Sequence, residues 1–64
     1  MCLSTVYKNE PKPENVLLSN VQRIEERDGV LLLTDIMERQ VAVEGRILLA
    51  DLVSGFVILA ERAQ

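Results

Sequence analysis

Short runs of apolar and β-branched residues alternate with turn-forming residues along the chain. Runs of this length, bounded by Gly, Pro, Asn, Asp or Ser, are typical of β-strands. The predicted strands are residues 2–8, 21–27, 30–34, 39–43, 46–52 and 56–60, with a brief further one at 16–18. Five to six short antiparallel strands at regular spacing indicate an all-β protein. We therefore expect residues 1–64 to form a single small β-barrel domain.

The dipeptide Asp28–Gly29 gives the sharpest local prediction. An Asp-Gly pair between two strand-like runs indicates a two-residue type I′ turn, because both of its positions need a positive φ. We therefore expect residues 21–27 and 30–34 to form a hairpin. Its register would pair Arg27 with Val30, Glu25 with Leu32 and Ile24 with Leu33.

A helix over residues 16–27 is the competing interpretation of this region. Its apolar residues fall at helical spacing, at Leu17, Val21 and Ile24. We prefer strands because the turn signal Ser19–Asn20 breaks the run. Glu44–Gly45 should likewise end a strand, and Pro11 and Pro13 predict an extended loop.

Two predicted strands are apolar on both faces, at Val30–Leu33 and Phe56–Ala60. A lone small barrel should carry polar residues on its outer face, so this surplus apolar surface needs cover. Central strands enclosed by loops are one solution. A second copy of the chain is the simpler one, and we expect a homodimer.

Composition excludes most catalytic chemistry. The 64 residues include 7 Lys and Arg against 10 Asp and Glu, which gives a net charge of −3, and there is no His. Without His, neither a Ser-His-Asp triad nor a closed Cys/His zinc site within one chain can form, and no glycine-rich phosphate loop is present. We therefore do not expect an enzyme.

The same sequence indicates where the protein resides. No basic region followed by an apolar stretch marks a secretory signal, and no apolar run approaches the roughly 18 residues of a membrane span. We expect a cytoplasmic protein that makes no contact with a membrane. Its single cysteine should then be a reduced thiol.

That cysteine, Cys2, directly follows Met1. If Met1 is removed, the amine and the thiolate of Cys2 can chelate one metal. If Met1 stays, its amine, the Cys2 amide nitrogen and the Cys2 thiolate can chelate in sequence. One chain cannot fill the site, but two chains about a two-fold axis offer the nitrogen and sulfur set that suits Ni(II) or Cu(II). A buried structural cysteine and an intermolecular disulfide remain alternatives.

Three segments of the chain resemble the CooT family, and together with their surroundings they cover most of its length. They are the Met1–Cys2 start followed by a strand, the hairpin residues 28–33, and the closing run from 47–52 to 57–59. CooT proteins are small cytoplasmic proteins associated with nickel delivery to carbon monoxide dehydrogenase. Many of their relatives carry an RNA-binding label.

The resemblance implies a homodimeric β-barrel in which Cys2 binds Ni(II) at the dimer interface. The implied function is that of a nickel chaperone, with one Ni(II) per homodimer held by the Cys2 thiolates and N-terminal backbone nitrogens, for a client metalloenzyme. The chain departs from the family pattern at residues 36–38, where we expect a glycine, and in the loop that contains Pro11 and Pro13.

An RNA-binding or protein-interaction barrel with a structural Cys2 is the alternative function. Its best candidates are four arginines, Arg23, Arg27, Arg39 and Arg46. Proteins that bind single strands combine a basic groove with aromatic stacking platforms. Here only Tyr7 and Phe56 could stack, and the net charge of −3 opposes contact with phosphates. We therefore do not expect a nucleic-acid partner.

Overall fold

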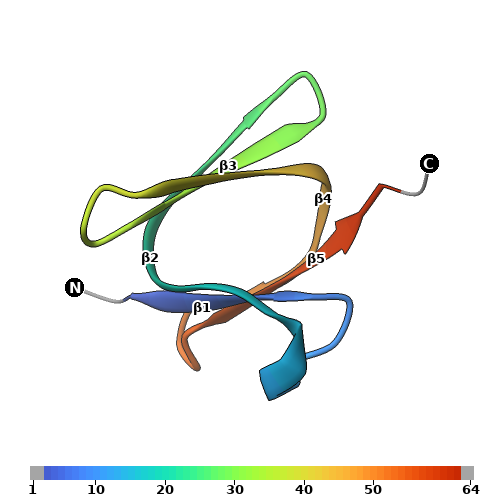
Figure 1. Ribbon diagram of the computed structural model, residues 1–64. Coiled ribbons are helices and arrows are strands. Elements are labelled where there is room, and N and C mark those ends of the chain that lie inside the picture. The colour runs from blue at the N-terminus through green and yellow to red at the C-terminus, as the bar shows by residue number, and fades with distance from the viewer. Residues whose placement is uncertain (1–2, 63–64) are drawn as a thin grey trace.

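The computed structural model describes residues 3–62, which form five strands and one short 3-10 helix. The elements are β1 (Ser4–Lys8), η1 (Pro13–Asn15), β2 (Val16–Arg27), β3 (Val30–Asp35), β4 (Gln40–Asp51) and β5 (Phe56–Glu61). The five strands close into a barrel (Figure 1). The predicted all-β barrel is therefore confirmed, and residues 16–27 form a strand and not a helix.

The ring is closed by a pairing between its first and last strands. β1 to β5 follow one another around the barrel in chain order, and each consecutive pair is antiparallel. β1 and β5 are parallel, with Val6 beside Val57. An odd number of strands that alternate in direction must place two parallel strands side by side where the ring closes. The predicted antiparallel arrangement therefore holds for every pair except this one.

The Asp28–Gly29 hairpin forms as predicted. Both residues have positive φ, 52° at Asp28 and 80° at Gly29, as a type I′ turn needs. The strands on either side pair in the predicted register, with Arg27 opposite Val30, Glu25 opposite Leu32 and Ile24 opposite Leu33.

β2 is one long strand that bends, and the predicted break at Ser19–Asn20 is wrong. Asn20 has a φ of 55°, a left-handed conformation that Asn tolerates better than most residues. β2 pairs with β1 as far as Val21, and from Val21 onward it pairs with β3. The bend at these turn residues thus allows one strand to pair with two different neighbouring strands.

β4 is also continuous, so the predicted strand end at Glu44–Gly45 is wrong as well. β4 pairs with β3 as far as Glu44 and with β5 from Gly45 onward. A Cβ atom at position 45 would overlap the carbonyl oxygen of Ala60. Glycine is needed here because the backbones of β4 and β5 approach too closely for any side chain.

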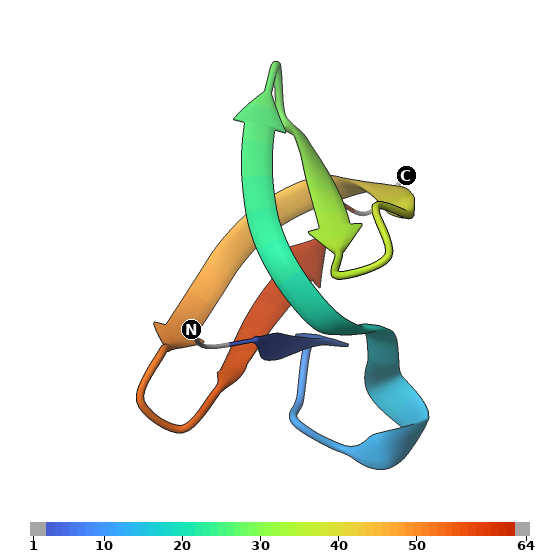
Figure 2. The ribbon, with the colours of Figure 1, turned by 90° about the vertical axis from the view of Figure 1, so that its left-hand side faces the viewer.

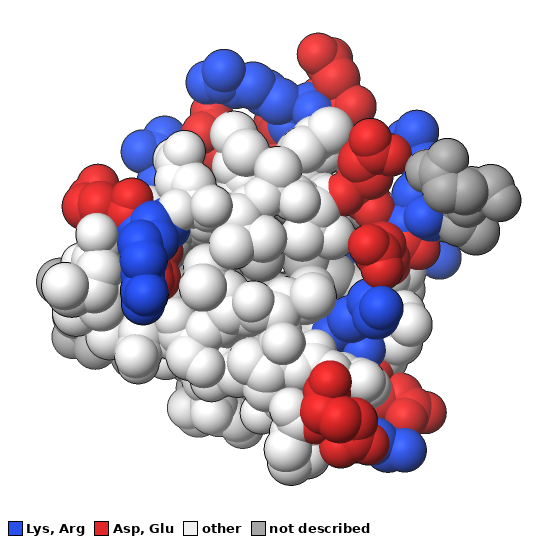
Figure 3. Space-filling view, viewed as in Figure 1, with Lys and Arg blue, Asp and Glu red and all other residues white. Residues whose placement is uncertain are grey.

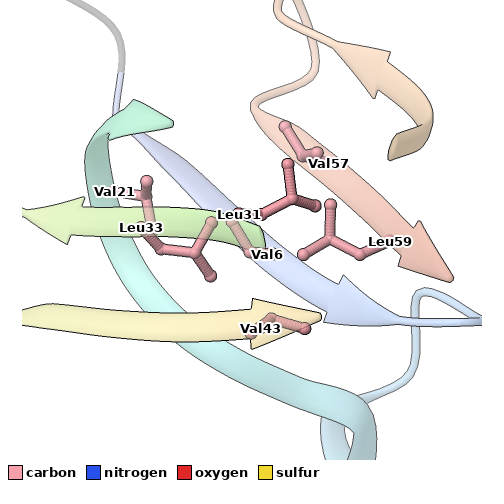
Figure 4. Packing of buried hydrophobic residues seen from close by; sticks show 7 residues of the cluster. All are labelled: Val6, Val21, Leu31, Leu33, Val43, Val57 and Leu59. Atoms are coloured by element: carbon pink, nitrogen blue, oxygen red, sulfur yellow. The ribbon is translucent and has the colours of Figure 1, made fainter. Parts of the chain in front are cut away.

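Seven aliphatic side chains fill the barrel, and every strand contributes at least one of them. Figure 4 shows them converging on its interior: Val6, Val21, Leu31, Leu33, Val43, Val57 and Leu59. Leu31 and Leu33 of β3, like Val57 and Leu59 of β5, alternate with half-buried neighbours. This alternation is the period of two that a strand imposes.

The connections between strands differ from expectation in two places. Pro13 does not continue an extended loop but starts η1 at the first helical position, where its missing N–H is no loss. In the β3–β4 loop, Glu38 has a φ of 68°, a conformation that favours glycine. The glycine expected within residues 36–38 thus corresponds to a real backbone requirement, which Glu38 meets under strain.

Candidate metal centre

The two predicted metal ligands, Cys2 and Met1, lie outside the described residues, so their positions rest on the sequence alone. The structure does place the segment that follows them. Ser4 is buried and pairs with Val21 of β2. The Thr5 N–H donates to the Gly55 carbonyl over 3.0 Å, which anchors β1 to the turn between β4 and β5. The chain therefore enters the barrel at a fixed point beside that turn.

Apolar surface surrounds this entry point. The β4–β5 turn exposes Leu52 and, completely, Val53, whose side chain is 100% accessible. Next to it lies a hollow of about 320 Å³ whose wall includes Ser4, Ile24 and Leu52. The sequence predicts a turn between strands 46–52 and 56–60, but the exposure of its apolar residues was not predicted. The available signal was Leu52–Val53, two apolar residues next to Ser54–Gly55, where a turn is normally polar.

The exposed apolar surface is real, but it centres on a different strand from the ones predicted. The outward residues of β3 and β5 are half-buried, whereas Ile47, Leu48 and Leu49 of β4 are all exposed. A bulge between Ile47 and Leu49 interrupts the alternation there, so three successive apolar residues face solvent. Figure 3 shows one face of the molecule with a broad uncharged area bordered by charged residues.

The acidic residues at the β3–β4 loop accept hydrogen bonds from other groups of the protein and so stabilise the loop. One Asp35 carboxylate oxygen accepts the N–H groups of Met37 and Arg39, both at 2.9 Å, and the other accepts the Arg39 Nε–H at 2.8 Å. Glu38 accepts a hydrogen bond from Gln22 over 3.0 Å. Within residues 3–62, no three His, Cys, Asp or Glu side chains gather into a group that could hold a metal.

These contacts set the acidity of Asp35. Burial alone would raise the pKa of its carboxyl group. The hydrogen bonds from Arg39 and Met37, together with the Arg39 charge, outweigh burial and lower the pKa below its ordinary value of 3.8. The carboxylate therefore stays ionised and holds the β3–β4 loop closed at neutral pH.

We predict that Asp35 contributes its full stabilisation of the fold above about pH 4 and loses it progressively in more acidic solution. Because its pKa is lower in the folded chain, its contribution is complete above the ordinary value of 3.8 and is lost as the pH falls through the folded value. Urea unfolding of the protein and of Asp35→Asn, at several pH values between 7 and about 2.5, measures this. The protein should be the more stable at pH 7, and the difference should shrink in acid. A difference that stays constant with pH would contradict this assignment.

Most of the side chains that favoured RNA binding contact other side chains of the protein. Arg23 and Arg27 both pair with Glu25, at 3.6 and 2.9 Å. Arg39 pairs with the buried Asp35, whereas Arg46 makes no ion pair within residues 3–62. The two candidate aromatic platforms, Tyr7 and Phe56, pack edge to face with ring centroids 6.3 Å apart.

Comparison with known proteins identifies the family. The family model described as CO dehydrogenase accessory protein CooT matches residues 1–60. The fold is similar to a crystal structure assigned as CooT from Carboxydothermus hydrogenoformans, with a TM-score of 0.85, 19% identity, and coverage of 97% of this chain and 100% of that chain. At that identity the likeness shows a shared fold. No curated protein matches the chain significantly.

The described part of the chain contains no helix that is both long and apolar enough to span a bilayer. The family model covers nearly the whole chain, and its description is that of an accessory protein and not of a catalyst. The chain therefore belongs to the CooT family of CO dehydrogenase accessory proteins.

Proposed function

We propose that this protein carries nickel for the maturation of CO dehydrogenase and binds one Ni(II) per homodimer. The ligands are the Cys2 thiolates of two chains, completed by backbone nitrogen at or next to residue 2. If Met1 is removed, that nitrogen is the Cys2 amine. If Met1 is retained, its amine and the Cys2 amide nitrogen are the donors. Planar nitrogen and sulfur ligation suits Ni(II), whereas zinc prefers a tetrahedron.

The observation that carries the proposal is the place of Cys2 in a chain of this family. It is the chain's one cysteine, and it precedes by two residues the buried start of β1. The backbone bond from Thr5 to Gly55 fixes this start next to Leu52 and Val53. Two copies that bury their exposed turns against each other would bring their Cys2 residues close to the same axis.

The RNA-binding alternative has less support. Arg23 and Arg27 share Glu25 as an ion-pair partner, and Arg39 is paired with Asp35. The net charge of −3 disfavours a phosphate backbone. The nickel experiments address the homodimer and the identity of the metal, and the cytoplasmic location is a further part of the proposal.

We predict that Cys2→Ala weakens Ni(II) binding by at least about 100-fold, because no other thiolate is present to replace it. Isothermal titration of the reduced protein with Ni(II) measures this. Met37→Ala is the matched control, since it removes an exposed thioether in the β3–β4 loop and should leave the affinity unchanged. Equal affinity of Cys2→Ala and the unmodified protein would exclude the proposed site.

A further inference from the structure

One edge of β2 has no neighbouring strand in the part of the chain that the structure describes. β1 pairs with β2 only as far as Val21, and from Arg23 to Arg27 the paired neighbour is β3 alone. Figure 2 shows the β2–β3 hairpin rising above the rest of the ring. In an antiparallel strand every second residue directs its N–H and C=O to the far edge. This half of β2 therefore presents backbone donors and acceptors to an incoming strand.

The hollow of about 320 Å³ borders the same edge. Val21 and Ile24 of β2 line it together with Leu52 and Val57, and the polar residues Gln22 and Arg23 line it as well. A strand added to β2 would point alternate side chains toward this hollow, since the side chains of a strand alternate between its two faces. The mainly apolar lining fits aliphatic side chains at those positions.

The opposite face of this edge is positively charged. Arg23 and Arg27 share it with Glu25, and their side chains are 69% and 72% exposed. Two guanidinium groups share one carboxylate, so the row carries a charge of 2 − 1 = +1 in a chain whose net charge is −3. Glu26 points to the other face. The row therefore favours acidic side chains on the added strand.

We propose that this edge of β2 binds an extended segment of a partner protein by β-strand addition. The aliphatic side chains of the segment enter the hollow, and its acidic side chains face Arg23 and Arg27. The backbone edge gives affinity, while the hollow and the charges select the sequence. The proposal does not rest on nickel binding, but Leu52 belongs both to the hollow and to the turn that the proposed homodimer would bury, so the partner segment and a second copy would compete for it. Strand addition would hold the partner beside Ser4, which lies on the wall of the hollow and is two residues from Cys2.

The test uses metal-free Cys2→Ala protein, so that its failure would leave nickel binding unaffected. The probe is a capped octapeptide in which Val alternates with Asp. Amide chemical shifts and hydrogen exchange of the labelled protein follow binding. We expect the peptide to shift and protect amides between Arg23 and Arg27. No such change at about 1 mM peptide, a concentration that detects even weak complexes, would overturn the proposal.

Three controls isolate the features that the proposal requires. A peptide with Lys in place of Asp should bind about tenfold more weakly, as should the double variant Arg23→Glu/Arg27→Glu. Arg46→Glu, an exposed substitution on β4 outside the hollow, should change nothing. The N–H groups of only one residue type in the peptide, Val or Asp, face β2. N-methylation of that set should abolish binding, and N-methylation of the other set should be tolerated.

Other results would contradict strand addition by a partner. Equal affinity for the Asp and Lys peptides would remove the charge selection. Protection, without peptide, of the Arg23–Arg27 amides that point away from β3 would mean that the edge is already occupied. If that protection rises with protein concentration, the occupant is a second copy of the chain. If it does not, the occupant is another segment of the same chain.

Discussion

Replacing Gly45 by Ala should remove most of the protein's free energy of unfolding. A Cβ atom at this position would overlap the Ala60 carbonyl oxygen, which belongs to the backbone of the paired strand β5 and cannot rotate away. Overpacking of this kind costs about 3 kcal/mol or more. A small domain has a free energy of unfolding of only about 5 kcal/mol. Circular dichroism during urea unfolding should show a large loss of stability.

Gly55→Ala is the matched control for this prediction. Gly55 has a φ of +84°, so alanine is strained there, but the nearest atom to its Cβ would be the Leu3 carbonyl oxygen at an ordinary 3.6 Å. We expect a cost of about 1–2 kcal/mol from the left-handed backbone alone. Equal unfolding midpoints for the two variants would show that close approach of β4 and β5 is not what requires Gly45.

Affinity for Ni(II) should fall at least about 100-fold for each unit of pH lost between about pH 7.5 and 6. Free thiols have a pKa of about 8.5, so both Cys2 thiols of a dimer are protonated in this range. The metal must displace one proton from each, and each displaced proton weakens binding about tenfold per pH unit. The terminal amines of the proposed site, with a pKa of about 7.7–8.0, steepen the dependence further because they too must lose a proton. Competition with a chelator of known pH dependence measures the slope.

A slope of one proton or fewer would mean that two thiolates do not share the metal. The fold itself should not contribute to the slope, since the pKa of Asp35 lies below 3.8, far from this range. Circular dichroism of the metal-free protein across the same pH range is the control. It should show no change in secondary structure.

The parts of the fold that the sequence predicts are those with local causes. The Asp28–Gly29 turn and its register depend on two residues and the strands beside them, and both are correct. The parallel closure of β1 against β5 joins residues about fifty positions apart, and no local pattern encodes it. It follows from the odd number of strands once the ring exists.

Turn-forming residues inside strands were the main source of error. Asn20 and Gly45 carry ordinary turn signals, but tertiary pairing uses them to redirect β2 and β4 from one neighbour to the next. The exposure of Ile47–Leu49 was also not predictable from local sequence. It depends on a bulge, which has no signature in the alternation of apolar and polar residues. The surplus of apolar residues could be predicted, but not the strand that would expose it.

The candidate ligands of the site could be predicted from the sequence, but the residues that lie near the site could not. Cys2 and Met1 stand out by position in the sequence alone. The anchoring of β1 to Gly55 brings the β4–β5 turn, with Leu52 and Val53, to the start of β1, although nearly fifty residues separate them. This proximity depends on the closure of the ring, so sequence patterns could not reveal it.

Native mass spectrometry of the nickel-loaded protein tests the central claim most directly, because it counts chains and metal ions in one species. Sub-stoichiometric Ni(II) should produce a species of two chains with one nickel, and Cys2→Ala should produce none. A predominant species of one chain with one nickel, or the two-chain species with nickel retained in Cys2→Ala, would contradict a metal shared between two Cys2 thiolates.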